Sequence, residues 1–249
     1  MIDRKARIAQ AFSLGATTYD NAATVQWSVA HRLAERIESA TAESPQRILE
    51  IGCGTGLLSA QLARAFPDCD LLLTDIAPSM LDRCRARMGN RHRYQLLDGE
   101  RPEELSGQFD LIVSSLAFQW FSDLRGGLSR LSKHLAPRGR MLFATLGCDT
   151  FTEWRQVHTD RGLSCGTHHY PRAEDFPWPD GFSHRLHAEW LVQSHTNGLD
   201  FVRNLRVIGA HEPISGYRSL APGAFRRLLT SLDDGFSVTY HVLYGEIFR

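Results

Sequence analysis

Short apolar runs alternate with segments of helical periodicity through the middle of the chain. Five such runs predict strands, at residues 47–51, 71–74, 94–97, 109–115 and 141–146. The segments between them predict helices over 57–66, 78–88 and about 123–135, and residues 137–139 predict a turn before the fifth strand. Strands and helices that alternate in this way are typical of an α/β fold with a doubly wound, mostly parallel sheet.

The two ends of the chain follow other patterns. Helices are expected at 3–12 and 22–40, and in the second one Val25, Val29, Leu33 and Ile37 recur every four positions. Residues 15–20 interrupt the helical period between them. After residue 147 the pattern weakens, and we expect an irregular cover at 148–183, a sixth strand at 186–192, helices at 199–209 and 225–232, and a closing strand at 236–248.

Composition narrows the classes of function by exclusion. The 249 residues include 28 Lys and Arg and 28 Asp and Glu, and this balance argues against a dedicated nucleic-acid binder. The five cysteines form no C-x-x-C pair, which argues against a zinc ribbon or a disulfide scaffold. The sequence contains no run of 18 apolar residues, which a membrane span would need, and the charged N-terminus lacks an apolar signal core. We expect a cytoplasmic protein with reduced thiols.

A glycine-rich loop follows the first predicted strand. The segment LEIGCGTG, residues 49–56, lies at a strand-to-helix junction, where glycines permit a tight turn and the helix N-terminus offers free N–H groups to an anion. A dinucleotide fingerprint would place a third glycine at position 57, where this chain has leucine, so the loop argues against NAD.

An acidic residue ends each of the next two strands. Asp75 ends the second strand, where a carboxylate can hold both hydroxyls of a ribose, or else cap the helix that follows. Asp98 ends the third strand, where it can accept a hydrogen bond from an adenine amino group, or else serve as a turn residue before Gly99.

These motifs together, with Glu100, resemble those of the class I S-adenosylmethionine-dependent methyltransferases. The resemblance implies a Rossmann-like sheet of seven strands, the last one antiparallel, with N-terminal helices and an inserted helical cap. It implies S-adenosyl-L-methionine as the cofactor and S-adenosyl-L-homocysteine as its product. The residues implied in cofactor binding are Tyr19, Glu50, Gly52, Gly54, Gly56, Asp75, Ile76, Asp98, Gly99 and Ser115, with Glu50 at the methionine end and Tyr19 closing over it.

We therefore expect a single methyltransferase domain over residues 1–249. Its parts are an N-terminal helical lid at 1–44, a cofactor-binding core at 47–147, a substrate cap with the sixth strand at 148–235, and the closing strand at 236–249.

Four further segments resemble one subgroup of that family. Residues 11–20 with Gln26, 115–120, 205–210 and 239–242 are similar to the malonyl-[acyl-carrier protein] O-methyltransferases of biotin synthesis, whereas residues 148–195 show no such similarity. The resemblance implies methylation of the free carboxyl of a malonyl thioester on acyl carrier protein. Two alternatives stay open: a methyltransferase for a free small acid such as trans-aconitate, whose enzyme has a similar Gln-Trp segment, and a non-catalytic module that binds the cofactor.

The expected chemistry requires no general base, because a carboxylate acceptor is already ionised at pH 7. Catalysis should come from proximity and exclusion of water, with Tyr19, Gln119 and Trp120 as the catalytic candidates. Trp120 follows the fourth strand, where it either contacts the sulfonium by a cation–π interaction or packs under the next helix. Arg203 and Arg206 lie on one face of a predicted helix, where they either bind the substrate or face the solvent.

Two further clusters of residues have simple alternatives. Arginines at 83, 85, 87, 91 and 93 form a basic run that either docks an acidic carrier protein or is a solvated helix face. His168 and His169 lie near Cys165, but their spacing matches no pair of metal ligands on a regular element, so we predict no metal site.

Overall fold

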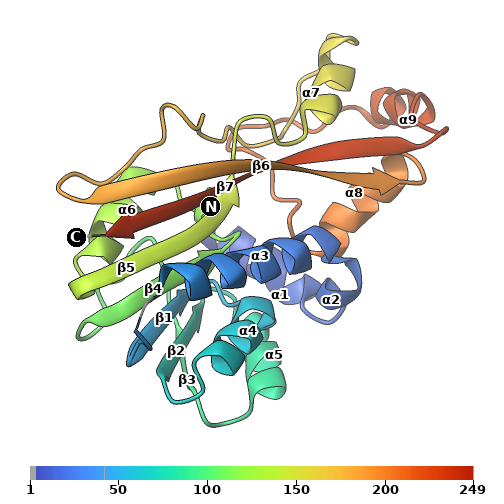
Figure 1. Ribbon diagram of the computed structural model, residues 1–249. Coiled ribbons are helices and arrows are strands. Elements are labelled where there is room, and N and C mark those ends of the chain that lie inside the picture. Colours follow the sequence, from blue (N-terminus) through green and yellow to red (C-terminus); the bar gives the residue numbers. More distant parts are fainter. Residues whose placement is uncertain (1–3, 42, 249) are drawn as a thin grey trace.

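The computed structural model describes residues 4–41 and 43–248, and it contains one twisted sheet covered by helices on both faces (Figure 1). This description leaves out residues 1–3, 42 and 249. Parts of the predicted lid, of the first predicted helix and of the closing segment therefore lie outside it. The strands are β1 Arg47–Ile51, β2 Asp70–Asp75, β3 Arg93–Leu96, β4 Phe109–Ser115, β5 Leu135–Leu146, β6 Ser183–His195 and β7 Phe236–Phe248.

The sheet has the order β3-β2-β1-β4-β5-β7-β6. Strands β1 to β5 pair in parallel, and β7 lies antiparallel between β5 and β6. The predicted α/β fold with a doubly wound, mostly parallel sheet and an antiparallel last strand is confirmed.

Helices surround the sheet, and those on its two faces pack through buried apolar side chains. They are α1 Arg4–Gly15, α2 Tyr19–Ala22, α3 Thr24–Ala40, α4 Leu57–Ala65, α5 Pro78–Met88, the 3₁₀ turn η1 Phe118–Trp120, α6 Leu124–Ser132, α7 Thr152–Thr159, α8 Gly198–Val207 and α9 Pro222–Thr230. The four predicted apolar positions of α3 are all buried, in the core cluster that α3 and α4 form with one face of the sheet. A second cluster, which includes Leu128 and Leu131 of α6, covers the other face. No helix among the described residues is long and apolar enough to cross a membrane.

Two predictions about β5 and β6 were wrong in their bounds. The turn expected at 137–139 lies inside β5, where residues 136–139 bulge out between the pairs Phe109–Leu135 and Leu111–Arg140. The strand resumes after Arg138, whose φ is +65°. Strand β6 is longer than expected because its whole length pairs with β7, although most of its side chains are exposed or half-buried.

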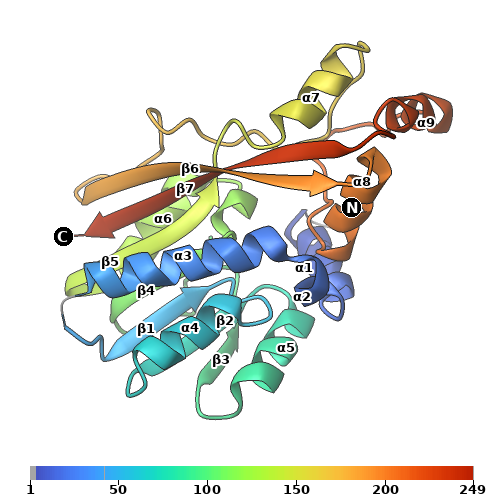
Figure 2. The ribbon, with the colours of Figure 1, turned by 45° about the vertical axis from the view of Figure 1, so that its right-hand side comes forward.

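The paired strands β6 and β7 extend past the end of β5. Strand β5 pairs with β7 only as far as Leu146 and Val242, whereas β6 continues to pair along residues 236–241. Helices α7, α8 and α9 gather at this overhanging end of the sheet (Figures 1 and 2). The overhang therefore carries the cap beyond the carboxyl ends of the parallel strands.

The N-terminal segment approaches the cap closely enough for backbone atoms of the two to pack directly. A Cβ built on Gly15, at the end of α1, would lie 2.8 Å from the carbonyl oxygen of Val207. A Cβ on Gly209 would lie 2.8 Å from both the Ala11 carbonyl oxygen and the Cα of Phe12, and the φ of Gly209 is +72°. Both glycines lie in segments that resemble the subgroup, at residues 11–20 and 205–210. Because they have no side chain, the backbones of the two segments can approach each other closely.

We expect Gly209→Ala to lower the free energy of unfolding by about 2–4 kcal/mol, because the new methyl group meets backbone atoms at a positive φ. The matched control is Gly216→Ala, since Gly216 has a φ of +79° but no atom within 4 Å of a built Cβ. The control should lose only about 1 kcal/mol. Denaturant unfolding measures both, and equal losses would show that the contact contributes nothing.

Candidate active site

A cavity lies against the carboxyl ends of the parallel strands, where doubly wound sheets bind their ligands. It brings together most of the residues that the sequence predicted for a cofactor. Its lining includes Lys5, Ile8, Phe12, Tyr19, Gly52, Gly54, Asp75, Ile76, Asp98, Gly99, Ser115 and Trp120. We call it the sheet-edge cavity.

The three glycines of the loop after β1 have different surroundings. Gly52 has a φ of +70°, and a Cβ there would lie 2.4 Å from the Cβ of Ala117. Gly54 has a φ of +55° and nothing within 4 Å, so its backbone is open to a ligand. Gly56, with a φ of +90°, faces Cys84 of α5 at 3.1 Å instead of the cavity. Gly54 is thus the glycine at which a ligand can approach the backbone closely, whereas Gly52 and Gly56 make room for neighbouring side chains of the protein.

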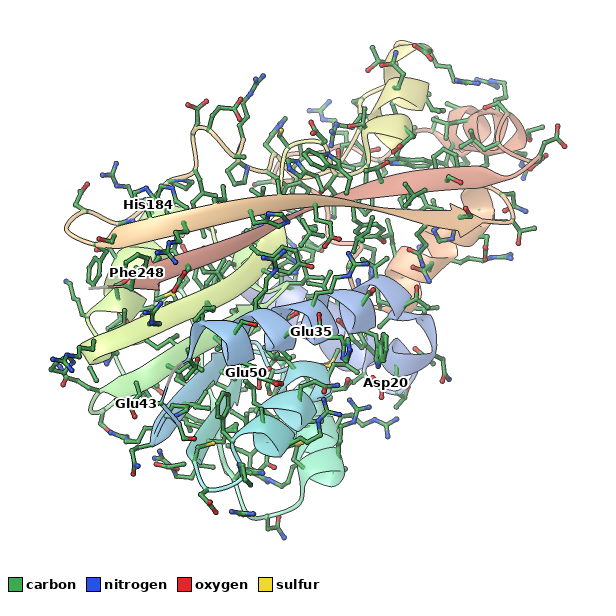
Figure 3. The ribbon with its side chains drawn as sticks, viewed as in Figure 1. Asp20, Glu35, Glu43, Glu50, His184 and Phe248 are labelled. Carbon is green, nitrogen blue, oxygen red and sulfur yellow. The ribbon has the colours of Figure 1, made fainter. Side chains whose placement is uncertain are left out.

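Glu50 is a buried acid at the end of β1, and it extends toward the face of the sheet that α3 and α4 cover (Figure 3). Its carboxylate accepts a hydrogen bond of 2.6 Å from the hydroxyl of Ser59. Burial raises the pKa of Glu50 well above its usual range. It lines a small pocket that shares Tyr19, Gly52 and Ser115 with the sheet-edge cavity. No described residue forms an ion pair with Glu50, so a cationic ligand would stabilise its ionised form.

Asp75 connects the glycine loop to the start of α5. Its carboxylate accepts hydrogen bonds from the backbone N–H groups of Gly54, at 2.9 Å, and Ala77, at 2.8 Å. Burial raises the pKa of Asp75 to about 6, although these N–H groups oppose the shift. The residue at the N-cap position of α5 is Ala77, so the alternative interpretation of Asp75 as the cap is wrong. Asp75 is buried and still lines the cavity.

Asp98 also lines the cavity, beside a lysine that no pattern in the sequence marked. Lys5 of α1 pairs with Asp98 at 3.0 Å and with Glu100 at 2.7 Å. Burial alone would raise the pKa of Glu100, but the Lys5 ammonium and the N–H groups of Ser122 and Asp123 lower it. Glu100 therefore holds α1 and the segment after Trp120 in place around Asp98.

Helices α1 and α2 close the cavity from outside. Asp20 of α2 accepts a hydrogen bond of 2.6 Å from Thr55 and pairs with Arg87. Phe12 packs edge-on against Trp120 with 5.4 Å between the ring centroids. Burial, and then the charges of Asp75 and Asp20, raise the pKa of Tyr19, so this side chain keeps its proton.

A second space, which we call the inner chamber, lies behind this wall. It shares Phe12, Tyr19, Leu116 and Trp120 with the sheet-edge cavity. Among the described residues, the polar side chains that line it are all neutral, and they include Tyr19, Gln26, Gln119, Tyr170 and Tyr240. Its volume of about 40 Å³ has room for about three water-sized groups.

The groups of the inner chamber differ in how they are held. Gln119 donates a hydrogen bond of 2.6 Å to the Leu116 carbonyl, which fixes its amide. The hydroxyl of Tyr240 is buried and has no hydrogen-bond partner among the described residues. Trp120 belongs to η1 and is half-buried between the two spaces, so the alternative of a core tryptophan packed under α6 is wrong.

The predicted arginines do not reach the inner chamber. Arg203 and Arg206 are exposed on α8, and Arg206 lines a different, larger cavity of the cap. Tyr170 and Tyr240 lie in the chamber instead. Tyr240 falls in a segment already noted for its similarity, but Tyr170 lies in the stretch without any, so no signal in the sequence marked it.

A separate cluster of possible metal ligands lies where β5 ends. Cys148, Asp149 and His241 place ligand atoms within 4.8 Å of one another. All three groups already have protein partners. The Cys148 thiol donates to the Asp149 carboxylate at 3.3 Å, which also accepts from Trp190 at 3.1 Å, and the Asp149 N–H donates to His241 at 3.3 Å. The cluster ties the end of β5 to β6 and β7. His168, in contrast, bonds to the Glu212 carbonyl at 2.8 Å.

Comparisons with known proteins agree with this architecture. A family described as a methyltransferase domain matches residues 49–141. The chain is 40% identical over 251 residues to a malonyl-[acyl-carrier protein] O-methyltransferase of Magnetococcus marinus, and the match covers 98% of this chain and 92% of that protein.

Two other relatives differ in length or in sequence. The chain is 44% identical over 240 residues to the biotin biosynthesis bifunctional protein BioCD of Bordetella avium. This match covers 96% of this chain and 51% of the relative, so the chain spans about half the length of that protein. The solved structure of a putative methyltransferase from Bacillus halodurans has a TM-score of 0.61 at 14% identity, and covers 87% of this chain and 97% of that one. That likeness shows the fold alone.

Proposed function

Because the chain belongs to the malonyl-[acyl-carrier protein] O-methyltransferases, we propose that it methylates the free carboxyl of a malonyl thioester on acyl carrier protein. The donor is S-adenosyl-L-methionine and the coproduct is S-adenosyl-L-homocysteine. The product, the malonyl methyl ester, starts pimeloyl synthesis for biotin. The ester removes the negative charge of the malonyl carboxylate, so that fatty-acid enzymes can extend the chain. The observation that carries this proposal is the shared wall of Phe12, Tyr19, Leu116 and Trp120 between the sheet-edge cavity and the inner chamber.

The residues of the sheet-edge cavity fit S-adenosylmethionine. Glu50 is a buried carboxylate without a cationic partner among the described residues, which suits the ammonium of the methionine end. The open backbone at Gly54 permits close approach, and Asp75 suits the ribose hydroxyls. Asp98 is the proposed partner of the adenine amino group, and Ile76, Gly99 and Ser115 complete the walls.

The chain contributes positioning and exclusion of water. S-adenosylmethionine, when bound, supplies a methyl group that a carboxylate oxygen takes, while the electron pair of the C–S bond stays on the sulfur. The acceptor is ionised at pH 7, so no residue has to remove a proton. Tyr19 and Trp120 form the wall between donor and acceptor, and the Trp120 ring suits the sulfonium by a cation–π interaction.

The inner chamber suits the malonyl head group in the chemistry of its lining. Tyr240, Tyr170 and Gln26 can donate hydrogen bonds to a carboxylate there, and Gln119 keeps its amide fixed beside them. A guanidinium would hold the carboxylate more tightly and reduce its nucleophilicity, whereas neutral donors orient it without that cost. The lining of the inner chamber contains no cation among the described residues, which argues against trans-aconitate, a tricarboxylate with more negative charge to hold.

We place the enzyme in the cytoplasm together with its carrier protein. The five cysteines are free thiols, which suits a reducing compartment.

Methyl transfer from labelled S-adenosylmethionine tests the proposed function. The wild-type protein should methylate malonyl-acyl carrier protein and, less efficiently, a malonyl N-acetylcysteamine thioester. Methylation of trans-aconitate in preference to both would establish the alternative acceptor. Binding of the cofactor without any transfer would establish the non-catalytic module.

Substitution of Asp75 tests the cofactor site. Its carboxylate is ionised above about pH 6 in the free protein, so the affinity for S-adenosylhomocysteine should fall as the pH decreases through 6. Asp75→Asn should remove this pH dependence of the affinity, and Asp75→Ala should weaken S-adenosylhomocysteine binding at pH 8 by about 1.5–3 kcal/mol. Calorimetry between pH 5.5 and 8 measures both effects. Unchanged affinity in a folded Asp75→Ala protein would exclude Asp75 from the site.

Substitution of Tyr240 tests the acceptor chamber. Tyr240→Phe removes a hydroxyl that has no partner among the described residues, so we expect no loss of stability and unchanged S-adenosylhomocysteine affinity. The kcat/KM for the malonyl thioester should fall about 10–100-fold, or about 1.4–2.7 kcal/mol. Tyr244→Phe is the matched control, because that hydroxyl is equally buried and unpartnered but lines a cavity beside α3. Equal activity in the two variants would contradict this role for Tyr240.

A further inference from the structure

A larger cavity within the cap adjoins the inner chamber. This cap cavity has a volume of about 360 Å³ and shares Phe151, Tyr170, Leu205 and Ala210 with the chamber. Its walls come from α7, α8, α9 and the segments 166–170 and 210–220. It thus lies between the site of methyl transfer and the exposed surface of the cap.

Four arginines that line the cap cavity or adjoin its lining residues in the chain have no ion-pair partner among the described residues. Arg206 lines it, and Arg218 lies between Tyr217 and Ser219, which both line it. Arg226 and Arg227 directly follow Phe225, another lining residue, and are exposed on α9. In residues 4–41 and 43–248, none of these four arginines makes an ion pair or a side-chain hydrogen bond.

The basic run at residues 83–93, by contrast, is largely engaged within the fold. Arg93 makes two hydrogen bonds to Asp70, at 2.8 and 2.6 Å. Arg87 pairs with Asp20, and Arg85 stacks over the ring of Tyr94 at 4.7 Å. Arg91 bonds to the Pro67 carbonyl. Carboxylates therefore neutralise Arg87 and Arg93, and the other contacts hold Arg85 and Arg91 against the fold.

We propose that the cap cavity receives the pantetheine arm of the malonyl carrier, and that the arginines around it dock the acidic carrier protein. This inference rests on the proposed function and adds the route and the docking face. The arm is a thin, largely neutral chain that a half-apolar passage can hold, whereas its phosphate and the acidic carrier stay outside. Unpartnered guanidinium groups at the mouth complement both of these anionic groups. Helices α8 and α9, which carry three of the four arginines, lie side by side at one end of the molecule (Figure 2).

A pair of charge reversals tests the docking face. Arg218→Glu with Arg226→Glu should raise the KM for malonyl-acyl carrier protein about 10-fold or more, while kcat/KM for the malonyl N-acetylcysteamine thioester stays within about twofold. Arg85→Glu with Arg91→Glu changes the net charge equally and should leave both substrates unaffected. A larger effect of the second pair, or equal losses with both substrates in the first pair, would overturn the docking face. A wild-type protein that methylates neither substrate would instead overturn the proposed function.

Obstruction of the cavity tests the route of the arm. Ser219 lines the cavity and is exposed, so Ser219→Trp narrows the passage without displacing buried side chains. It should lower kcat/KM for malonyl-acyl carrier protein at least about 10-fold, with S-adenosylhomocysteine affinity and Tm unchanged. Ser215→Trp, exposed on the same segment but not part of the lining, is the control. Wild-type activity in Ser219→Trp would show that the arm enters elsewhere.

Discussion

The antiparallel pairing of β7 between β5 and β6 is the constraint on which the site depends. Since β7 continues past the end of β5, residues 236–241 and their partners on β6 form a two-stranded extension of the sheet. The cap helices pack on this extension, and Tyr240 projects from it into the inner chamber. Without the extension, the carboxyl edge of the parallel strands would still bind a cofactor but would have no second wall to confine an acceptor.

The two halves of the site handle charge in opposite ways. Carboxylates are concentrated on the side of the proposed cofactor site, where Glu50 and Asp75 are buried with raised pKa values. The inner chamber, the proposed acceptor site, presents hydroxyls and amides, and Arg206 lines the cap cavity instead. This separation suits a reaction between a cation and an anion, because a cation beside the acceptor would repel the sulfonium and stabilise the carboxylate.

The N-terminal segment joins the two halves. Lys5 and Asp20 bind it to the core through Asp98, Glu100 and Thr55. On the other side, Thr18 donates to the Val207 carbonyl at 3.2 Å and Asn204 donates to the Ala22 carbonyl at 3.2 Å. Any opening of the predicted lid has to break contacts with both halves, so donor and acceptor sites would open together.

The sequence by itself determined those features that depend on local periodicity and on residues at strand ends. The apolar stripe of α3, the strands β1, β4 and β7, the glycine loop and Asp75 are all local signals, because a buried face and a tight turn restrict residue types over a few positions. Glu50 was marked only by the resemblance to the methyltransferase family. Only the tertiary structure decided which residues meet in the inner chamber. Tyr170 and Tyr240 arrive there from distant segments, and Arg203 and Arg206 stay outside, because the packing of the cap on β6 and β7 sets the direction in which α8 faces. Short-range pattern carries no information about that packing.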